Sequence, residues 1–156
     1  MRKSFLIGLI FIIPSLFSSC NKSSSTDLVG NWVNRYDFDG IARSYAVGFT
    51  IGDKSYLIGG YDGDDRLRLI DSWQYDPSKN QWLRLADFPG VGRTGAVAFA
   101  ANGKGYVGLG YDGTNKLNDF WEYDPTLNTW TQVADFPDSP RYGSVAFSVG
   151  NYGYVL

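Results

Sequence analysis

The sequence predicts an all-β fold: a partial β-propeller made of four-stranded antiparallel blades. Three observations support this. Features of the sequence recur about every 50 residues, short apolar runs are bounded by Gly, Asp, Asn and Pro, and the chain is rich in Gly (19 of 156 residues) and in aromatic residues (17%). Short runs between turn-forming residues are typical of strands, and a repeat that cannot bury its faces alone must stack against its neighbours.

The first twenty residues have the parts of an export signal. Met1, Arg2 and Lys3 precede an apolar run over 5–17, and small residues then lead to Cys20, the single cysteine. The run is shorter than the roughly 20 residues that a spanning helix needs. Residues 17–20 resemble the lipobox of bacterial lipoproteins, with Phe17 in place of the usual Leu, which implies a signal peptide over 1–19 and a lipid anchor on Cys20. Residues 20–27 are then a tether. The expected location is the bacterial cell envelope, facing the outer membrane or periplasm; a secreted protein with an incidental cysteine is the alternative.

Three segments that each begin with an arginine define the repeat. Arg93 follows Arg43 by 50 positions and Arg141 follows Arg93 by 48, and each segment continues into Val-x-Phe. We therefore expect a first blade over 43–92, a second over 93–140 and the start of a third over 141–156. In the first blade the expected strands are 45–50, 55–60, 71–75 and 81–86. The two-residue difference between units falls in the loop before the third strand, where insertions are tolerated.

The two ends of the array predict an incomplete ring. Trp32 precedes Arg43 by 11 residues, as Trp82 precedes Arg93, so residues 28–42 are expected to hold an orphan outer strand that closes a propeller ring. The third unit stops within its second strand. Because a closed propeller has about 4 to 8 blades, the sequence is expected to be an N-terminal piece of a larger propeller.

The residues of each unit resemble the Kelch repeat. The shared features are the leading Arg, a Lys-x-Tyr strand that runs into a glycine pair, Tyr-Asp-Pro after a Trp, Asn-x-Trp and a final Phe-Pro. The second unit departs from the pattern, since Leu109 splits its glycine pair. The resemblance covers the chain from Asn31 onward and implies a propeller similar to galactose oxidase or to the sialic acid mutarotases, with peptides or sugars bound on one face.

Composition excludes several kinds of chemistry. The chain has no histidine, so neither Ser-His-Asp catalysis nor a His metal site can be built, and no cofactor, metal or catalytic residue is expected. A formal charge of −2 gives no basic field for nucleic acid. The glycines from Gly108 to Gly113 match a dinucleotide-binding pattern without the helix that it needs. The acidic turn over 62–65 lacks the spacing of a calcium loop and is expected to be a turn.

Two sets of residues are candidates for ligand binding. The leading arginines stand near the central channel, where they either bind ligand carboxylates or, as we favour, tie blades together through backbone carbonyls or Asp. The second set lies in the variable loops on the same face. The recurring tryptophans (Trp32, Trp73, Trp82, Trp121 and Trp130) are expected to be core. The binding candidates are Arg43, Arg93, Arg141, Tyr61, Arg66, Arg68, Tyr111 and Thr114.

The expected function is that of an envelope-anchored binding module whose ligand is a protein or a glycan. The alternative is a metal-free carbohydrate isomerase similar to the Kelch-type sialic acid mutarotases, with its channel completed by further C-terminal blades. That alternative depends on the resemblance of the stretch 82–90 and on fold analogy. A structural role in an envelope complex is a third possibility, for which the sequence names no partner.

Overall fold

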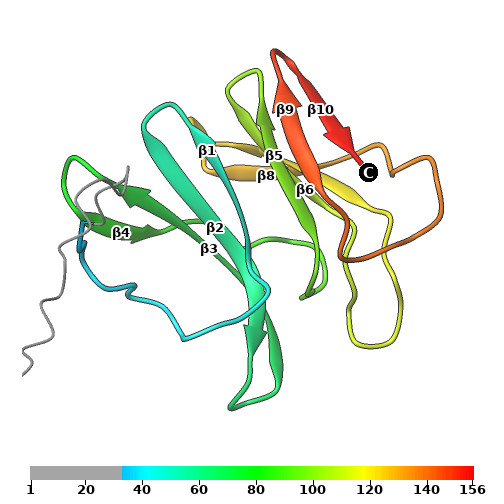
Figure 1. Cartoon of the computed structure of the whole chain (residues 1–156), viewed down its shortest axis with the longest axis horizontal. Helices are drawn as coiled ribbons and strands as arrows, with labels where there is room; N and C mark the ends of the chain where they lie inside the picture. Colours follow the sequence, from blue (N-terminus) through cyan, green and yellow to red (C-terminus); the bar gives the residue numbers. More distant parts are fainter. Residues whose placement is uncertain (1–32) are drawn as a thin grey trace, which may run out of the picture. The chain divides into compact units, whose positions relative to one another are not determined.

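The computed structural model describes residues 33–156, and within this range it contains ten strands and no helix (Figure 1). The sequence had predicted an all-β fold, which is confirmed. The strands are β1 (Val47–Ile51), β2 (Lys54–Asp62), β3 (Leu67–Asp76), β4 (Gln81–Arg84), β5 (Val97–Ala101), β6 (Lys104–Gly108), β7 (Phe120–Asp124), β8 (Thr129–Val133), β9 (Ala146–Val149) and β10 (Tyr152–Val155).

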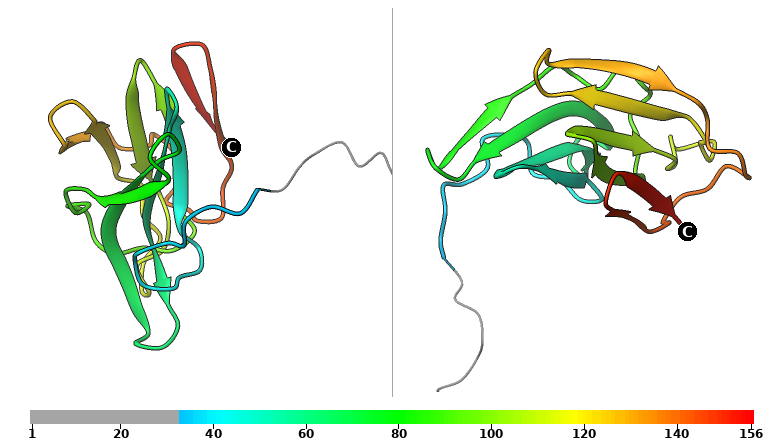
Figure 2. Two further views of the ribbon diagram at one scale, coloured as in Figure 1. Left: turned by 90° about the vertical axis from the view of Figure 1, so that its left-hand side faces the viewer. Right: turned by 90° about the horizontal axis from the view of Figure 1, so that it is seen from above.

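The strands form two complete four-stranded blades and one two-stranded hairpin. The orders are β1-β2-β3-β4 and β5-β6-β7-β8, with β9 paired to β10, and every neighbouring pair is antiparallel. The first strand of each unit lies beside the first strand of the next, β1 by β5 and β5 by β9. The three sheets therefore stack face to face around a common inner edge (Figure 2), which is an unclosed part of a propeller.

The core lies between blades. Phe49, Tyr56 and Ile58 of the first blade meet Val107 and Tyr123 of the second in one buried cluster. Strands have a side-chain period of two, so alternate residues of each strand reach the neighbouring sheet. A second cluster, formed by Val97, Leu109 and Phe120, has Phe99, Ala146 and Val155 packed against it. Each blade is thus stabilised chiefly by the blade beside it.

The sheets approach so closely that the second strand needs a glycine. A Cβ added to Gly105 would lie 2.0 Å from Cζ of Phe49, and one added to Gly153 would lie 2.0 Å from Cε2 of Phe99. Any side chain at these positions would displace the preceding blade's phenylalanine. The same aromatic–glycine contact therefore sets the spacing at both interfaces between blades.

The two complete blades differ at their second hairpin, where the sequence prediction was too short. Strands expected over 55–60 and 71–75 extend to Asp62 and back to Leu67, with a register shift between Ile58 and Gly60. The carboxylate of Asp62 accepts the backbone N–H groups of Asp64 and Asp65 at 2.9 and 3.4 Å. These hydrogen bonds give the acidic stretch the turn role that we favoured.

The segment before the first blade makes the same contacts as the linker between the first and second blades. The N–H of Tyr36 donates to Oδ1 of Asn80 at 3.0 Å, and Phe38 packs edge-on against Trp73 and Trp82. Fifty residues later, the N–H of Ala86 donates to Asn128 in the same way. The described part of the expected outer strand over 28–42, residues 33–42, forms no strand.

Several sequence predictions fall outside the described residues. These are the signal peptide over 1–19, the acylated Cys20, the tether over 20–27 and the core position of Trp32. Within residues 33–156 there is no helix with the length and apolar character required to cross a membrane.

Candidate functional site

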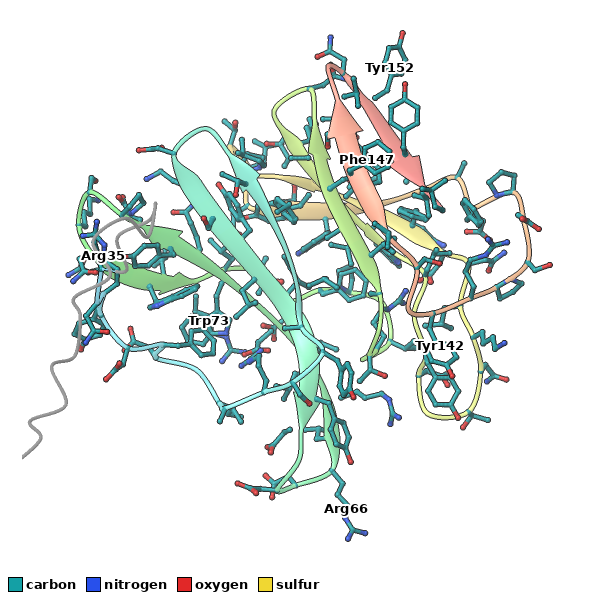
Figure 3. The ribbon with its side chains drawn as sticks, in the orientation of Figure 1. Arg35, Arg66, Trp73, Tyr142, Phe147 and Tyr152 are labelled. Atoms are coloured by element: carbon teal, nitrogen blue, oxygen red, sulfur yellow. The ribbon has the colours of Figure 1, made fainter. Side chains whose placement is uncertain are left out.

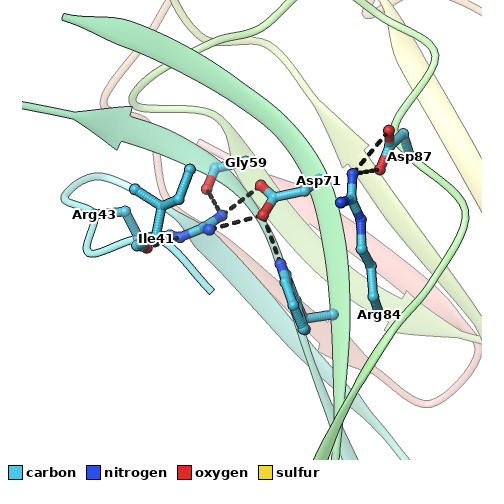
Figure 4. A network of polar contacts seen from close by, with 7 residues as sticks. Ile41, Arg43, Gly59, Asp71, Arg84 and Asp87 are labelled. Atoms are coloured by element: carbon cyan, nitrogen blue, oxygen red, sulfur yellow. Dashed lines mark hydrogen bonds and ion pairs between the residues drawn. The ribbon is translucent and has the colours of Figure 1, made fainter. Parts of the chain in front are cut away.

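Arg43 is committed to its own blade. Its guanidinium donates to both carboxylate oxygens of Asp71, at 2.6 and 2.7 Å, to the carbonyl of Gly59 at 3.0 Å and to that of Ile41 at 2.9 Å (Figure 4). The indole N–H of Trp73 donates to the same carboxylate at 2.6 Å. Since this paired geometry satisfies most of the guanidinium, Arg43 connects three segments of the first blade.

Arg93 repeats this arrangement in the second blade. It donates to Asp119 at 2.6 and 2.8 Å and to the carbonyls of Leu109 and Val91, and its side chain is 3% exposed. Burial alone would raise the pKa of Asp119, but hydrogen bonds from Arg93 and Trp121 outweigh it and hold that pKa below its ordinary value. The carboxylate therefore stays ionised as the counterion of a buried arginine.

Arg141 has the same link to its preceding segment but different acid contacts. Its Nε donates to the carbonyl of Ser139 at 3.1 Å and the guanidinium lies over the Phe136 ring, as Arg43 and Arg93 lie over equivalent phenylalanines. Its ion pair is with the nearby, exposed Asp138. The three predicted channel residues thus hold each unit to the segment before it. Their acceptors lie in their own unit and its linker, and not in the next blade, to which we had expected each arginine to tie its blade. Whether any of them also contacts a ligand stays a prediction.

The loop candidates Tyr61, Arg68 and Tyr111 do come together. The guanidinium carbon of Arg68 lies 5.6 Å from the ring centre of Tyr61 and 5.5 Å from that of Tyr111, so one cation touches aromatic rings of two blades. Tyr61 and Arg68 are cross-strand partners in β2 and β3. The Nε of Arg68 is buried without a hydrogen-bond partner among the described residues. Arg68 therefore differs from Arg93, whose N–H groups have acceptors within the fold.

The same pattern continues into the third unit. Lys116 lies 5.8 Å from the ring centre of Tyr142, and Tyr111 and Tyr142 have ring centres 5.5 Å apart. We call these five residues, Tyr61, Arg68, Tyr111, Tyr142 and Lys116, the tyrosine–cation row. It runs across all three units on the rim that carries the loops between second and third strands.

Sequence reasoning missed Tyr142 and Lys116, although the repeat contained a signal for one of them. Lys116 stands 48 positions after Arg68, the same offset that relates Asp119 to Asp71, so both blades have a cation at this position. Tyr142 had no comparable signal, because the equivalent position in the second blade is Thr94. Its contact with Tyr111 depends on how the third unit packs against the second.

The remaining loop candidates lie on the same rim but outside the row. Arg66 is exposed at the tip of the β2–β3 hairpin, and Figure 3 shows it on the same edge of the molecule as Tyr142. The backbone N–H of Thr114 donates to Oδ1 of Asp112 at 2.7 Å, so this residue shapes a turn. Backbone N–H groups of Asn115 and Thr114 hold the pKa of Asp112 below its ordinary value.

Chemically, the rim offers recognition by stacking and hydrogen bonding. Residues 33–156 contain no cluster of three or more His, Cys, Asp or Glu side chains that could hold a metal ion. Four of the five tryptophans lie in this range, and they pack on linker phenylalanines: Trp73 and Trp82 on Phe38, and Trp121 and Trp130 on Phe88. They are partly buried packing residues, as the sequence predicted, and the exposed aromatic surface of the rim is tyrosine.

Comparisons with known proteins agree with this architecture. The family model of the KLHDC2/KLHL20/DRC7 Kelch-repeats domain matches residues 26–156. A solved structure, that of YjhT, superposes with a TM-score of 0.69 at 20% sequence identity, covering 81% of this chain and 47% of that one. The chain therefore spans about half the length of that solved protein, and the likeness concerns the fold. A search of curated proteins by sequence gave no match.

Proposed function

Because the chain belongs to the family of Kelch-repeat β-propellers, we propose that it forms part of a binding module that holds a protein segment along the tyrosine–cation row. The observation that carries the proposal is Arg68, a cation fixed between two aromatic rings with a buried N–H that no described residue accepts. Tyrosine and arginine are the side chains that most often dominate the free energy of protein association.

The geometry of Arg68 favours binding because the side chain is ordered in advance. Two tyrosine rings within cation–π distance restrict the guanidinium, so less side-chain entropy is lost when a ligand arrives. Because the Nε of Arg68 is buried, a backbone carbonyl or a carboxylate of a bound segment would accept from the Nη groups, which donate to no described residue. The row also joins three units, so a ligand lying along it would contact side chains that differ from blade to blade.

A random-peptide library displayed on phage tests this proposal with the purified full-length protein. We expect enrichment of peptides that bind the wild type, and a loss of at least about tenfold in their affinity for Arg68→Ala, which corresponds to 1.4 kcal/mol. Lys79→Ala is the matched control, since Lys79 is an exposed cation in the β3–β4 turn outside the row. Failure to enrich any peptide, or equal affinity in Arg68→Ala, would contradict the proposal.

Parallel assays distinguish the protein ligand from a glycan ligand and from the enzymatic alternative. Binding on a glycan array that is lost in Arg68→Ala, without any peptide enrichment, would assign the row to carbohydrate instead of protein. Turnover in a sugar anomerisation assay would favour the isomerase over a pure binding module. The row contains no pair of carboxylates that could act as acid and base, which favours a binding module over the isomerase. Tyrosine and arginine are enriched at protein-binding surfaces, which favours a protein ligand over a glycan.

We also propose that the module is held at the bacterial cell envelope by a lipid on Cys20. Support comes from the sequence, in which Cys20 follows a short apolar run and two small residues. Growth with radiolabelled palmitate should label the wild type, whereas Cys20→Ser should be unlabelled and should leave the membrane fraction. Equal labelling of both proteins would contradict an anchor at this cysteine.

A further inference from the structure

Tyr45 occupies a backbone conformation for which the repeat otherwise uses glycine. The residue that follows each leading arginine by two positions is Tyr45, Gly95 or Gly143, and the φ angles are 55°, 60° and 70°. These angles fall in the left-handed region, where a Cβ crowds the following carbonyl and a bulky residue is an outlier. The first unit thus places an aromatic residue where the chain geometry calls for glycine.

The fold gains little from this tyrosine. Tyr45 is 71% exposed, so its ring contributes little by leaving water. In the second blade a Cβ on Gly95 would lie 3.2 Å from the backbone N of Gly143, which is tight, and would reach ordinary contact distance from the Tyr142 ring. The residue that corresponds to Tyr142 beside Tyr45 is Thr94, which has no ring. Each interface between units therefore exposes one tyrosine near the channel, Tyr45 at the first and Tyr142 at the second. The two tyrosines stand at different positions of the repeat.

Tyr45 also adjoins the tyrosine–cation row. Its neighbour Ser44 exchanges two backbone hydrogen bonds with Tyr61, at 3.0 and 2.7 Å, and Tyr61 begins the row. Two residues further on, Val47 begins β1, the innermost strand of the first blade. Tyr45 consequently lies on the inner side of the row, toward the channel, on the rim that carries the loops.

We propose that Tyr45 is a ligand-contacting residue that determines specificity by packing its ring against an apolar side chain of the bound protein segment. Strained residues persist where surrounding structure fixes them, and they concentrate at ligand-binding positions. The exposed rings of Tyr45 and Tyr142 form the inner part of the contact surface, and Arg68 with its two flanking tyrosines forms the outer part. This inference rests on the proposed function of the row.

Two substitutions separate binding from folding at this position. Asparagine tolerates the left-handed region and glycine is unrestricted there. Tyr45→Asn and Tyr45→Gly should therefore keep the midpoint of thermal unfolding within about 3 °C of the wild type or raise it. Both variants should bind the peptides selected with the wild type at least about tenfold more weakly. Tyr45→Phe keeps the ring and should retain the affinity within about twofold.

Tyr152→Asn is the matched control, because Tyr152 is also 71% exposed but begins β10 at the opposite rim (Figure 3). It should bind the selected peptides as the wild type does. Wild-type affinity in Tyr45→Asn would overturn the inference, since the ring would then make no contact with the ligand. A midpoint of thermal unfolding lowered by many degrees would also overturn it, since the ring would then stabilise the fold. A wild type that selects no peptide would overturn the proposed function itself, a failure visible before any Tyr45 variant is made.

Discussion

Arg93 and Arg68 are two arginines of adjacent blades with opposite surroundings. Arg93 is 3% exposed and donates to a carboxylate and two backbone carbonyls, whereas Arg68 lies between two tyrosine rings and its Nε has no acceptor among the described residues. The N–H groups of Arg93 therefore have their acceptors within the fold. Arg68 has no such partners among the described residues.

The neighbouring side chains decide the role of a cation in this fold more than its residue type does. Arg43 and Arg93 each have a recurring aspartate, Asp71 within the third strand of its blade and Asp119 just before it, and a tryptophan that donates to that aspartate. Arg68 and Lys116 have aromatic neighbours instead. The four cations are repeated features of the units, so repetition alone does not distinguish a structural position from a binding position.

Arg93→Ala should show the largest effect on stability. It would leave Asp119 partly buried without its counterion, and breaking a buried pair by removing one partner costs about 3–5 kcal/mol. The free energy of unfolding from urea titration measures this loss. Arg141→Ala is the control, because its pair with Asp138 is more exposed and should contribute about 1 kcal/mol or less. A loss below that of Arg141→Ala would contradict the structural role of Arg93.

The stability of the protein at acid pH should also depend on the ion pair between Arg93 and Asp119. The pKa of Asp119 is lowered in the folded protein, so its contribution to stability is present above the unfolded-state value of about 4 and is lost as pH falls through the folded-state value. Asp119→Asn should cost about 1–3 kcal/mol at neutral pH and should make stability fall less steeply below pH ~4. Stability measured from pH 7 to pH 3 checks this, with Asp87→Asn as an exposed control. Parallel acid profiles for wild type and Asp119→Asn would contradict the ion pair.

Much of this fold could be predicted because its signals repeat. Residues that recur at a fixed offset, such as Arg43 with Arg93, defined the units, and the strands follow from short apolar runs between turn residues. The tryptophans were recognised as packing residues for the same reason. Prediction failed at the second hairpin of the first blade, where β2 and β3 stay paired up to Asp62 and Leu67, beyond the pattern that the two units share.

The proposed binding surface was only partly predictable, since it depends on contacts between units. Tyr61, Arg68 and Tyr111 were chosen as variable loop residues, and the structure stacks them together. Tyr142 contacts the row because the third unit packs against the second, and the sequence of a single repeat does not encode that packing. Tyr45 could have been noticed in the sequence as the one bulky residue at a position with glycine in the other two units.

Arg68→Ala should change stability much less than Arg93→Ala. The loss is that of partly exposed cation–aromatic contacts, about 1 kcal/mol, with no carboxylate left unpaired. Urea titration of the two variants side by side gives the ratio. If Arg68→Ala were as damaging as Arg93→Ala, Arg68 would be a structural link between blades, and the distinction between the two arginines would fail.

Arg68→Lys should have the smallest effect on stability and still impair binding. Lysine keeps the charge and can remain near both rings, so the free energy of unfolding should change by about 0.5 kcal/mol or less. It lacks the planar fork that can hold a carboxylate or carbonyl with two parallel hydrogen bonds, so affinity for peptides selected with the wild type should fall severalfold. Calorimetric titration with those peptides measures the affinity, and thermal unfolding measures the stability. Full affinity in Arg68→Lys would show that charge alone suffices and that the flat stacking of the guanidinium has no part in recognition.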